Sequence, residues 1–420
     1  MNTQTITRGI ASHLPALVFA LVTLLTGLAS ISAYGPLTIP DPDIHVYASY
    51  ALATGQIGQN IRTMDDGAGN QVHIQYVRMP SNLRQAPLDN KTVGNILDPV
   101  NHENDERFKQ WNKLTMADVG SGLKASRANQ YSPLSFIPQA VGIGLARATG
   151  ASMWNQLQVG RISSLLVYCM LGVISVVLVR RLGWLMTVIL ANPVSVFVAS
   201  SLSADTLTNT VAALTIALAV KLGVCEKRST LLIVGLSVCL ALLVPLKLCY
   251  MPLALLPLAL ETIRLRDRLL ITVIPTAVGI ILMCWWSLSY GRIAATVNMS
   301  ETKKHLVDHP IHDILRSLVG GWNNVWRVLA GHGIMTAAIL VILTAFVLTT
   351  RKMSFDRKRI CVVIAAAILS TTAIAGMLII TWAKPTLPWG VAPFGFQERY
   401  LLPLLPLLVF TTKPETSLSK

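Results

Sequence analysis

The stretch LPALVFALVTLLTGLASISAY, from Leu14 to Tyr34, decides the class of fold. It contains no charged side chain and has the length of about 20 residues that an α-helix needs to cross a bilayer. The whole chain is similarly apolar, with 53% hydrophobic residues, 13% charged residues and a mean hydropathy of +0.56. Soluble globular proteins carry about 25% charged residues. The composition therefore predicts an integral membrane protein.

Further apolar stretches of comparable length recur along the chain. They predict an all-α integral membrane protein with about ten transmembrane helices and two long extracytoplasmic loops. The predicted spans lie near 13-34, 157-179, 183-200, 204-222, 230-247, 249-263, 269-290, 332-350, 360-382 and 400-411.

Lys and Arg residues in the short breaks between these stretches indicate the orientation. With ten spans, one side carries Arg8, Arg180-Arg181, Lys227-Arg228, the run Arg264 to Arg268 and the run Arg351 to Arg359. That side is the cytoplasm by the positive-inside rule, and both termini lie there. The net charge of +15 follows this distribution. No nucleic-acid partner is predicted, because nucleic-acid binders gather their cations on one polar face.

The predicted organisation alternates membrane segments with two outer loops. The apolar segment 131-149 is placed along the outer interface or as a re-entrant piece, since a full crossing would move Arg180-Arg181 outside and its two prolines favour a bent entry. The stretch 60-130 is expected to form short helices and mobile loop. The first helix is preferred as an uncleaved anchor over a cleaved signal peptide. The predicted parts are 1-34, a first transmembrane helix; 35-156, a large extracytoplasmic loop; 157-290, a transmembrane core; 291-331, a second outer loop with an amphipathic helix at 311-329; and 332-420, C-terminal helices with a short cytoplasmic tail.

Two acids and an imidazole follow the first span, in the run Asp41-Pro42-Asp43-Ile44-His45. The topology places this run at the outer mouth of the first helix. Carboxylates there suggest chemistry at the membrane surface, although Asp-Pro pairs also occur in ordinary turns.

Four more charged residues border the apolar runs on the same predicted face: Arg161, Asp205, Lys247 and Arg399. Asp205 has a simpler interpretation as a helix cap, and Lys247 as a cation that reaches toward water. Three cations that depart from the inside bias, grouped with carboxylates at one surface, indicate a site for an anionic group such as a lipid phosphate. The spacing of the cysteines does not resemble a zinc site.

Six short blocks, in order, carry a family resemblance. They are Pro40-Asp41-Pro42-Asp43-Ile44-His45; Tyr131-Ser132-Pro133-Leu134 with Pro138-Gln139-Ala140; Gly160-Arg161; Ser201-Leu202-Ser203-Ala204-Asp205; Pro245-Leu246-Lys247; and Gly395-Phe396-Gln397-Glu398-Arg399-Tyr400 with Leu402-Pro403. Together they resemble the bacterial membrane-protein family called domain of unknown function 2142.

That family is itself similar to the C-type (GT-C) glycosyltransferase superfamily. The resemblance implies a multi-pass protein of the bacterial cytoplasmic membrane that uses a polyprenyl-phosphate-linked sugar donor and a glycan or lipid acceptor in cell-envelope assembly. It implies that Asp41, Asp43 and His45 are catalytic residues. A divalent metal ion at Asp41 and Asp43 is a candidate cofactor. This chain departs from the family by carrying Pro42 where a glutamate is usual, so the second acid is either replaced by Asp43 or lost.

The chemistry of glycosyl transfer agrees with this assignment. It needs a base for the acceptor hydroxyl and a positive environment for the departing phosphate. Asp41 or Asp43 would supply the base, and a substrate-binding set would consist of Arg161, Asp205, Lys247, Gln397 and Arg399. Two alternatives stay open: a transporter or flippase of lipid-linked glycans, and a non-catalytic membrane scaffold. The absence of an evident internal repeat favours the enzyme over the transporter.

Overall fold

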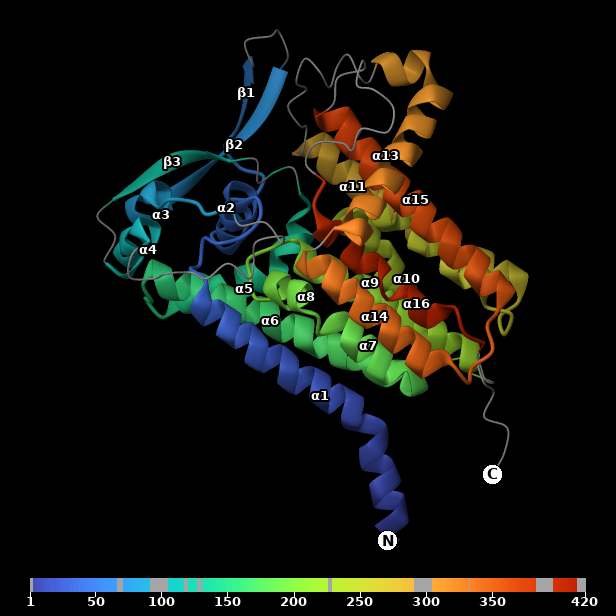
Figure 1. Ribbon diagram of the computed structural model, residues 1–420. Coiled ribbons are helices and arrows are strands. Elements are labelled where there is room, and N and C mark those ends of the chain that lie inside the picture. The colour runs from blue at the N-terminus through green and yellow to red at the C-terminus, as the bar shows by residue number, and fades with distance from the viewer. Residues whose placement is uncertain are drawn as a thin grey trace.

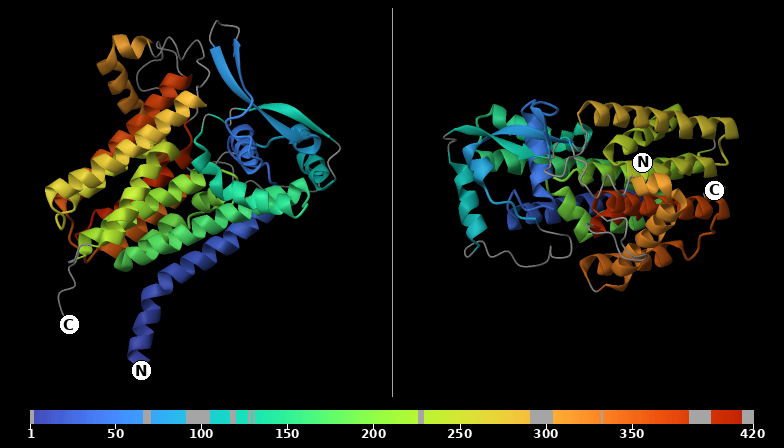
Figure 2. Two further views of the ribbon diagram at one scale, coloured as in Figure 1. Left: turned by 180° about the vertical axis from the view of Figure 1, so that it is seen from behind. Right: turned by 90° about the horizontal axis from the view of Figure 1, so that it is seen from above.

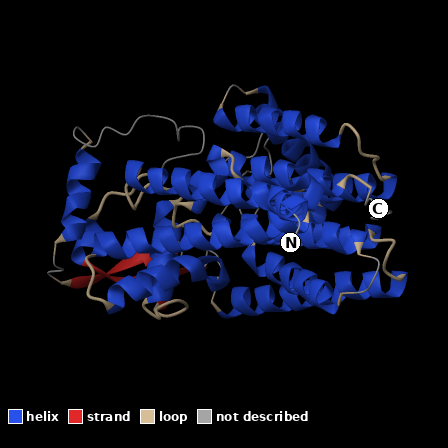
Figure 3. Cartoon of the chain, turned by 90° about the horizontal axis from the view of Figure 1, so that it is seen from below, coloured by secondary structure: helices blue, strands red, loops and turns tan. Residues whose placement is uncertain are grey.

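The computed structural model describes residues 3–65, 71–90, 105–116, 120–126, 129, 131–225, 229–290, 304–331, 333–382 and 396–413. Within these ranges the chain is mostly helical, with long helices side by side and one small sheet at an end of the molecule (Figures 1 and 3). The structure confirms the predicted fold class, a mostly helical membrane protein. The predicted cytoplasmic pair Lys227-Arg228 falls outside the described residues.

Five described helices are long and apolar enough to cross a membrane. They are α1 (Thr3–Ala33), α6 (Met153–Leu178), α9 (Asp205–Val224), α11 (Leu265–Ser289) and α15 (Arg357–Trp382). Two bent pairs raise the number to as many as seven if each pair is one span. The sequence predicts about ten spans, whereas the described residues contain five to seven helices or bent pairs that could cross a membrane.

The first bent pair combines the turn η5 (Arg180–Leu182) and α7 (Gly183–Leu190) with α8 (Pro193–Ala199), at an angle of 73°. The second combines α13 (Pro310–Ala330) with α14 (Ile334–Thr350), at 85°. The break before α8 has a local cause, because Asn192 caps the new helix by accepting from the backbone N–H of Ser195 at 3.0 Å. Pro193 then takes the first helical position, where its missing N–H is not needed.

The other predicted spans correspond to shorter apolar elements. These are α10 (Thr230–Leu246), the 3₁₀ helix η6 (Leu248–Ala259), the 3₁₀ helix η7 (Glu398–Leu404) and α16 (Leu407–Phe410). Each of the first three contains proline, which removes a backbone donor and interrupts regular helical hydrogen bonding. Between α10 and η6 the backbone of Lys247 is extended, with φ −164° and ψ 103°. A charged residue therefore occupies a break between two apolar helices.

The segment after α1 folds into a separate lobe at one end of the molecule (Figures 1 and 2). This N-terminal lobe consists of α2 (Pro42–Ala53), β1 (Ile61–Asp65), β2 (Gln71–Pro80), α3 (Ser81–Gln85), α4 (Glu106–Trp111), the 3₁₀ helix η2 (Asn112–Thr115) and β3 (Ser121–Ser126). The sheet has the order β1-β2-β3 and both pairs are antiparallel. In its register Gln75 pairs with Ile61 on one side and with Ser126 on the other.

The core of the lobe explains why the sheet forms. Gln75, Val77 and Met79 alternate along β2 as fully buried residues, which is the period of two that a strand requires. They belong to the same lobe as the buried Trp111, whose indole N–H donates to the carbonyl of Pro87 at 2.8 Å. The prediction of short helices and mobile loop for 60-130 was therefore wrong about the strands. Because one of the three buried positions is Gln75, a count of apolar residues along 60-130 does not reveal the alternation of buried residues that marks this strand.

The predicted interfacial segment 131-149 forms the 3₁₀ helix η4 (Pro133–Phe136) and α5 (Ile137–Ala148). α5 is too short to be a candidate span. It packs against α6 at a contact between glycines: a Cβ built on Gly142 would lie 2.5 Å from the carbonyl oxygen of Val159 and 2.8 Å from the Cα of Gly160. The two backbones can approach this closely because neither glycine carries a side chain.

This contact predicts the effect of adding one methyl group. Gly142→Ala should destabilise the protein by about 1–3 kcal/mol, because the clash is with backbone atoms that cannot turn away. The matched control is Gly144→Ala in the same helix, where a Cβ meets no atom within 4 Å. The control should be neutral or stabilising by about 0.5–1 kcal/mol. Thermal unfolding in detergent measures both, and equal midpoints for the two variants would contradict the contact.

Candidate functional site

Asp41 begins the site with an uncommon backbone conformation. Its φ of 57° and ψ of 54° lie in the left-handed region, which aspartate tolerates better than most residues. The conformation is the more uncommon because a residue before proline, here Pro42, usually adopts the extended region. Pro42 itself is accepted at the start of α2, where no N–H is required. The backbone N–H of Asp41 donates to Asn90 Oδ1 at 2.9 Å.

The Asp41 carboxylate does not cap its own helix, although Asp at this position usually does. It turns toward the C-terminal part of the chain instead. Oδ2 accepts from Arg399 Nη2 at 2.6 Å and from Gln397 Nε2 at 3.1 Å. The Asp41 carboxylate therefore pairs with a residue 358 positions away in the sequence and not with its own helix.

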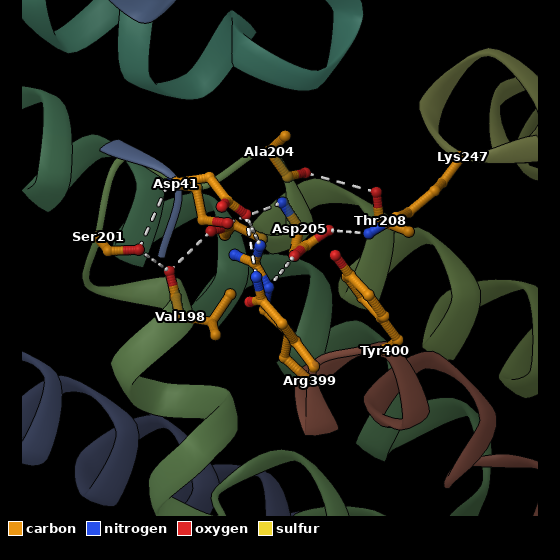
Figure 4. A network of polar contacts seen from close by, with 12 residues as sticks. Asp41, Val198, Ser201, Ala204, Asp205, Thr208, Lys247, Arg399 and Tyr400 are labelled. Atoms are coloured by element: carbon orange, nitrogen blue, oxygen red, sulfur yellow. Dashed lines mark hydrogen bonds and ion pairs between the residues drawn. The ribbon is translucent and has the colours of Figure 1, made fainter. Parts of the chain in front are cut away.

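A second carboxylate joins the same arginine to a lysine. Asp205, the first residue of α9, lies with Oδ2 3.2 Å from Arg399 Nε, and its Oδ1 accepts from Lys247 Nζ at 2.7 Å. The Lys247 ammonium also lies 4.2 Å from the ring centre of Tyr400. The ion network Asp41–Arg399–Asp205–Lys247 thus joins the start of α2, η7, the start of α9 and the break after α10 (Figure 4).

The four side chains of this ion network differ in how far they are exposed to solvent. The side chains of Arg399 and Asp205 are 1% and 5% exposed, that of Lys247 is 13% exposed, and that of Asp41 is 30% exposed. Two carboxylates balance two cations, which is what buried charges require. Asp41 is the member of the four that solvent and a bound molecule can reach most easily.

His45 lies one helical turn after Asp41 and is fully buried. Its ring centre is 5.4 Å from that of Tyr131 and 5.9 Å from that of Phe136. Burial, followed by the positive charge of Arg399, lowers the pKa of His45 to about 3, and the nearby carboxylates do not compensate. The imidazole is therefore neutral near pH 7 and cannot supply a proton as imidazolium.

Several buried polar atoms near Asp41 have no hydrogen-bond partner within the described ranges. They include both ring nitrogens of His45, Nη1 of Arg399 and Oε1 of Gln397. Buried polar groups are nearly always paired, so the unpaired atoms beside the partly exposed Asp41 need an explanation. A bound polar molecule would supply the missing partners.

The structure places Arg161 in a different environment from the ion network. Its buried guanidinium donates to the carbonyls of Tyr34 at 2.7 Å and Ser200 at 2.8 Å, and makes longer contacts with those of Ser30 and Ile31. These contacts satisfy the C-terminal carbonyls of α1 and attach that helix to the end of α8. The geometry gives Arg161 a positioning role and does not bring it to Asp41.

Asp43 lies in the first turn of α2, where its backbone carbonyl accepts from Ser126 Oγ at 3.3 Å. Burial and then the Asp43 charge raise the pKa of Tyr47 to about 12. Arg399 already supplies positive charge at Asp41, so this arrangement does not favour a metal ion there.

Residues that sequence reasoning left out of the site include Tyr131, Tyr400 and Gln139. Tyr131 contacts the His45 ring, Tyr400 faces Lys247, and Gln139 Nε2 donates to the carbonyl of Ser203 at 2.7 Å beside Asp205. All three stand in the short blocks that carry the family resemblance. Their positions in those blocks could have identified them as candidate site residues from the sequence.

These observations define the class: a multi-pass helical membrane protein with a buried ion network beside a partly exposed carboxylate. The chain belongs to the family described as predicted membrane protein (DUF2142), whose pattern matches residues 24–408. The whole ion network falls inside the matched range. No curated protein and no solved structure matches the chain.

The ion network predicts non-additive mutational effects. Lys247→Met and Asp205→Asn should each destabilise the protein, because each leaves a buried charge with less compensation. The double variant should be less destabilised than the sum of the two, with a coupling of about 0.5–3 kcal/mol. Thermal unfolding of the four proteins in the same detergent measures this coupling. Strict additivity would contradict a direct Lys247–Asp205 interaction.

The buried His45 predicts a loss of stability in acid. The folded pKa of about 3 lies below the ordinary value of 6.5. Between these values the unfolded chain binds more protons. His45 therefore contributes its full stabilisation above pH 6.5, and the free energy of unfolding decreases as the pH falls below that value. At pH 5 the decrease should be at most about 2 kcal/mol.

The measurement compares thermal midpoints at pH 7.5 and pH 5 for the wild type and for His45→Gln, which cannot titrate in this range. The variant should lose part of the pH dependence. His73→Gln, a change in β2 of the N-terminal lobe, should retain it. An unchanged pH dependence in His45→Gln would show that other groups cause the effect.

Proposed function

We propose that this protein is a polyprenyl-phosphate-sugar-dependent glycosyltransferase that acts on the outer face of a bacterial cytoplasmic membrane, in cell-envelope glycan assembly. The observation that carries the proposal is the placement of Asp41. Its carboxylate is 30% exposed and is held from behind by the buried guanidinium of Arg399. A reacting base needs this combination of access and fixed orientation.

Asp41 is proposed as the general base. Arg399 and Gln397 both contact Oδ2, so Oδ1 is the oxygen outside these two contacts. In the reaction the acceptor oxygen forms a bond to the anomeric carbon and its proton passes to Asp41. The bond from that carbon to the phosphate oxygen breaks, and the phosphate leaves with the electron pair.

Arg399 and Lys247 are proposed to stabilise the departing phosphate. Nη1 of Arg399 has no partner among the described residues, and a phosphate oxygen is a suitable acceptor for it. Asp205 positions both cations through its two oxygens. His45 stays neutral, so it would take part as a hydrogen-bonding group rather than as a source of charge.

The proposal includes a topology of ten spans with both termini in the cytoplasm and an uncleaved first helix. It follows from the positive residues between the apolar segments. In this topology the N-terminal lobe and the start of α13 lie outside, and the polyprenyl chain would lie between spans next to α13. The amphipathic sequence of α13, with exposed Ile311, Trp322 and Trp326, suits that position.

One observation favours a second candidate, a transporter or flippase of lipid-linked glycans. Lys247 lies at a break between α10 and η6, and interrupted helices with charged residues often form transport sites. A third candidate, a membrane scaffold, is favoured by the balanced charges of the ion network. The experiment below separates all three.

The test uses purified protein in proteoliposomes with a panel of labelled polyprenyl-phosphate sugars and a lipid extract of the source membrane as acceptor. Asp41→Asn should abolish transfer while leaving expression intact, because Asp205 still pairs with Arg399. Arg399→Ala should weaken donor binding first. Asp43→Asn is the matched variant in the same helical turn, and it should retain transfer.

Unchanged transfer in Asp41→Asn would refute the assignment of the base. Movement of the labelled lipid between leaflets without sugar transfer would support the flippase instead. A protein that does neither, with Asp41→Asn destabilised, would support the scaffold.

A further inference from the structure

Three histidines and one aspartate meet where a short helical turn at 304–308 ends and α13 begins. The residues are His305, His309, His312 and Asp313. His309 interrupts the helical backbone, with φ −134° and ψ 57°, and so brings the turn before it back toward the first turn of α13. On a straight helix the spacing i, i+4, i+7, i+8 would place these side chains on one face but spread them over about two turns, and the bend at His309 shortens that separation.

The Asp313 carboxylate is at the centre of this cluster. Its Oδ2 lies 3.0 Å from Nδ1 of His305 and its Oδ1 lies 3.0 Å from Nδ1 of His312. One ligand atom from each of these three residues lies within 4.8 Å of the others. The ring centres of His305 and His309 are 4.8 Å apart, so a third imidazole borders the cluster.

Burial in this cluster follows the pattern of a metal site with an open side. The Asp313 side chain is 5% exposed, whereas His305 and His312 are 29% and 41% exposed. The buried carboxylate contacts both imidazoles, and the two imidazoles are partly accessible to solvent.

The donor types select the class of ion. Imidazole nitrogens suit Zn²⁺ and neighbouring transition metals, whereas Mg²⁺ and Ca²⁺ prefer sets of oxygen ligands. The cluster has one carboxylate, and the charged Arg316 interacts with it from the next turn of α13. The net negative charge of the cluster is therefore low, and its affinity for a metal ion would have to come from coordination by the imidazole nitrogens.

We propose that His305, His312 and Asp313 bind one divalent transition-metal ion of the zinc type, with the His309 ring beside them. The ion joins the turn at 304–308 to the start of α13 and so stabilises the outer end of that helix. This proposal is independent of the glycosyltransferase assignment, because none of the described contacts connects the cluster to Asp41.

The experiment uses the full-length protein in detergent, purified with a tag that contains no histidine and treated with a chelator. Zn²⁺ is then titrated and bound metal is measured by elemental analysis after gel filtration. We expect about one Zn²⁺ per chain, and a higher thermal midpoint in the presence of Zn²⁺. Co²⁺ in place of Zn²⁺ should give visible absorption typical of nitrogen and oxygen coordination, whereas Mg²⁺ should not compete.

His305→Ala/His312→Ala should lower the affinity for Zn²⁺ by at least about tenfold and remove the thermal shift. His312→Asn is the milder variant, since that side chain is 41% exposed and its change should leave the fold intact. His73→Ala, in the N-terminal lobe, is the control and should bind Zn²⁺ as the wild type does. Equal Zn²⁺ binding by the wild type and His312→Asn would overturn the proposal, as would the absence of Zn²⁺ binding.

Discussion

The Arg399 guanidinium holds together parts of the chain that are far apart in sequence. It contacts Asp41 near the start of the described chain and Asp205 at the beginning of α9. A buried arginine without carboxylate partners would cost several kcal/mol, and so would either carboxylate left alone. The N-terminal lobe, the central helices and η7 therefore reach their low-energy arrangement together. Any chemistry at Asp41 depends on this closure.

Breaks in the apolar helices make the ion network possible. Lys247 occupies the extended residue between α10 and η6, and Asp205 opens α9 a few residues after the end of α8. Charged side chains at helix ends can meet one another and the free backbone groups there without lying against lipid. Arg161 supports the same region by binding the last carbonyls of α1 and the carbonyl of Ser200. The arginine predicted to bind substrate thus organises the scaffold around the site.

Sequence reasoning located most of the candidate site. Asp41, Asp205, Lys247 and Arg399 were singled out because charges at the predicted outer ends of apolar segments are costly without a purpose, and Gln397 because it stands in a block that carries the family resemblance. The structure brings all five together. The same reasoning grouped Arg161 with them. It could not place Arg161 elsewhere, since the side of a helix that faces a partner depends on residues far away in the sequence, here Tyr34 and Ser200.

The chain's apolar character, its mostly helical class and its family membership were determined by the sequence alone, because hydrophobic length and short ordered blocks are local properties. The tertiary structure decided which carboxylate meets Arg399, that β2 pairs with β1 and β3, and that the cluster of His305, His312 and Asp313 gathers at a bend. The pairing of Asp41 with Arg399 and of β2 with β3 joins parts of the chain that are distant in sequence, and the histidine cluster depends on the bend at His309. Packing and the pairing of buried charges decide which distant parts meet, and no local pattern of residues contains that information.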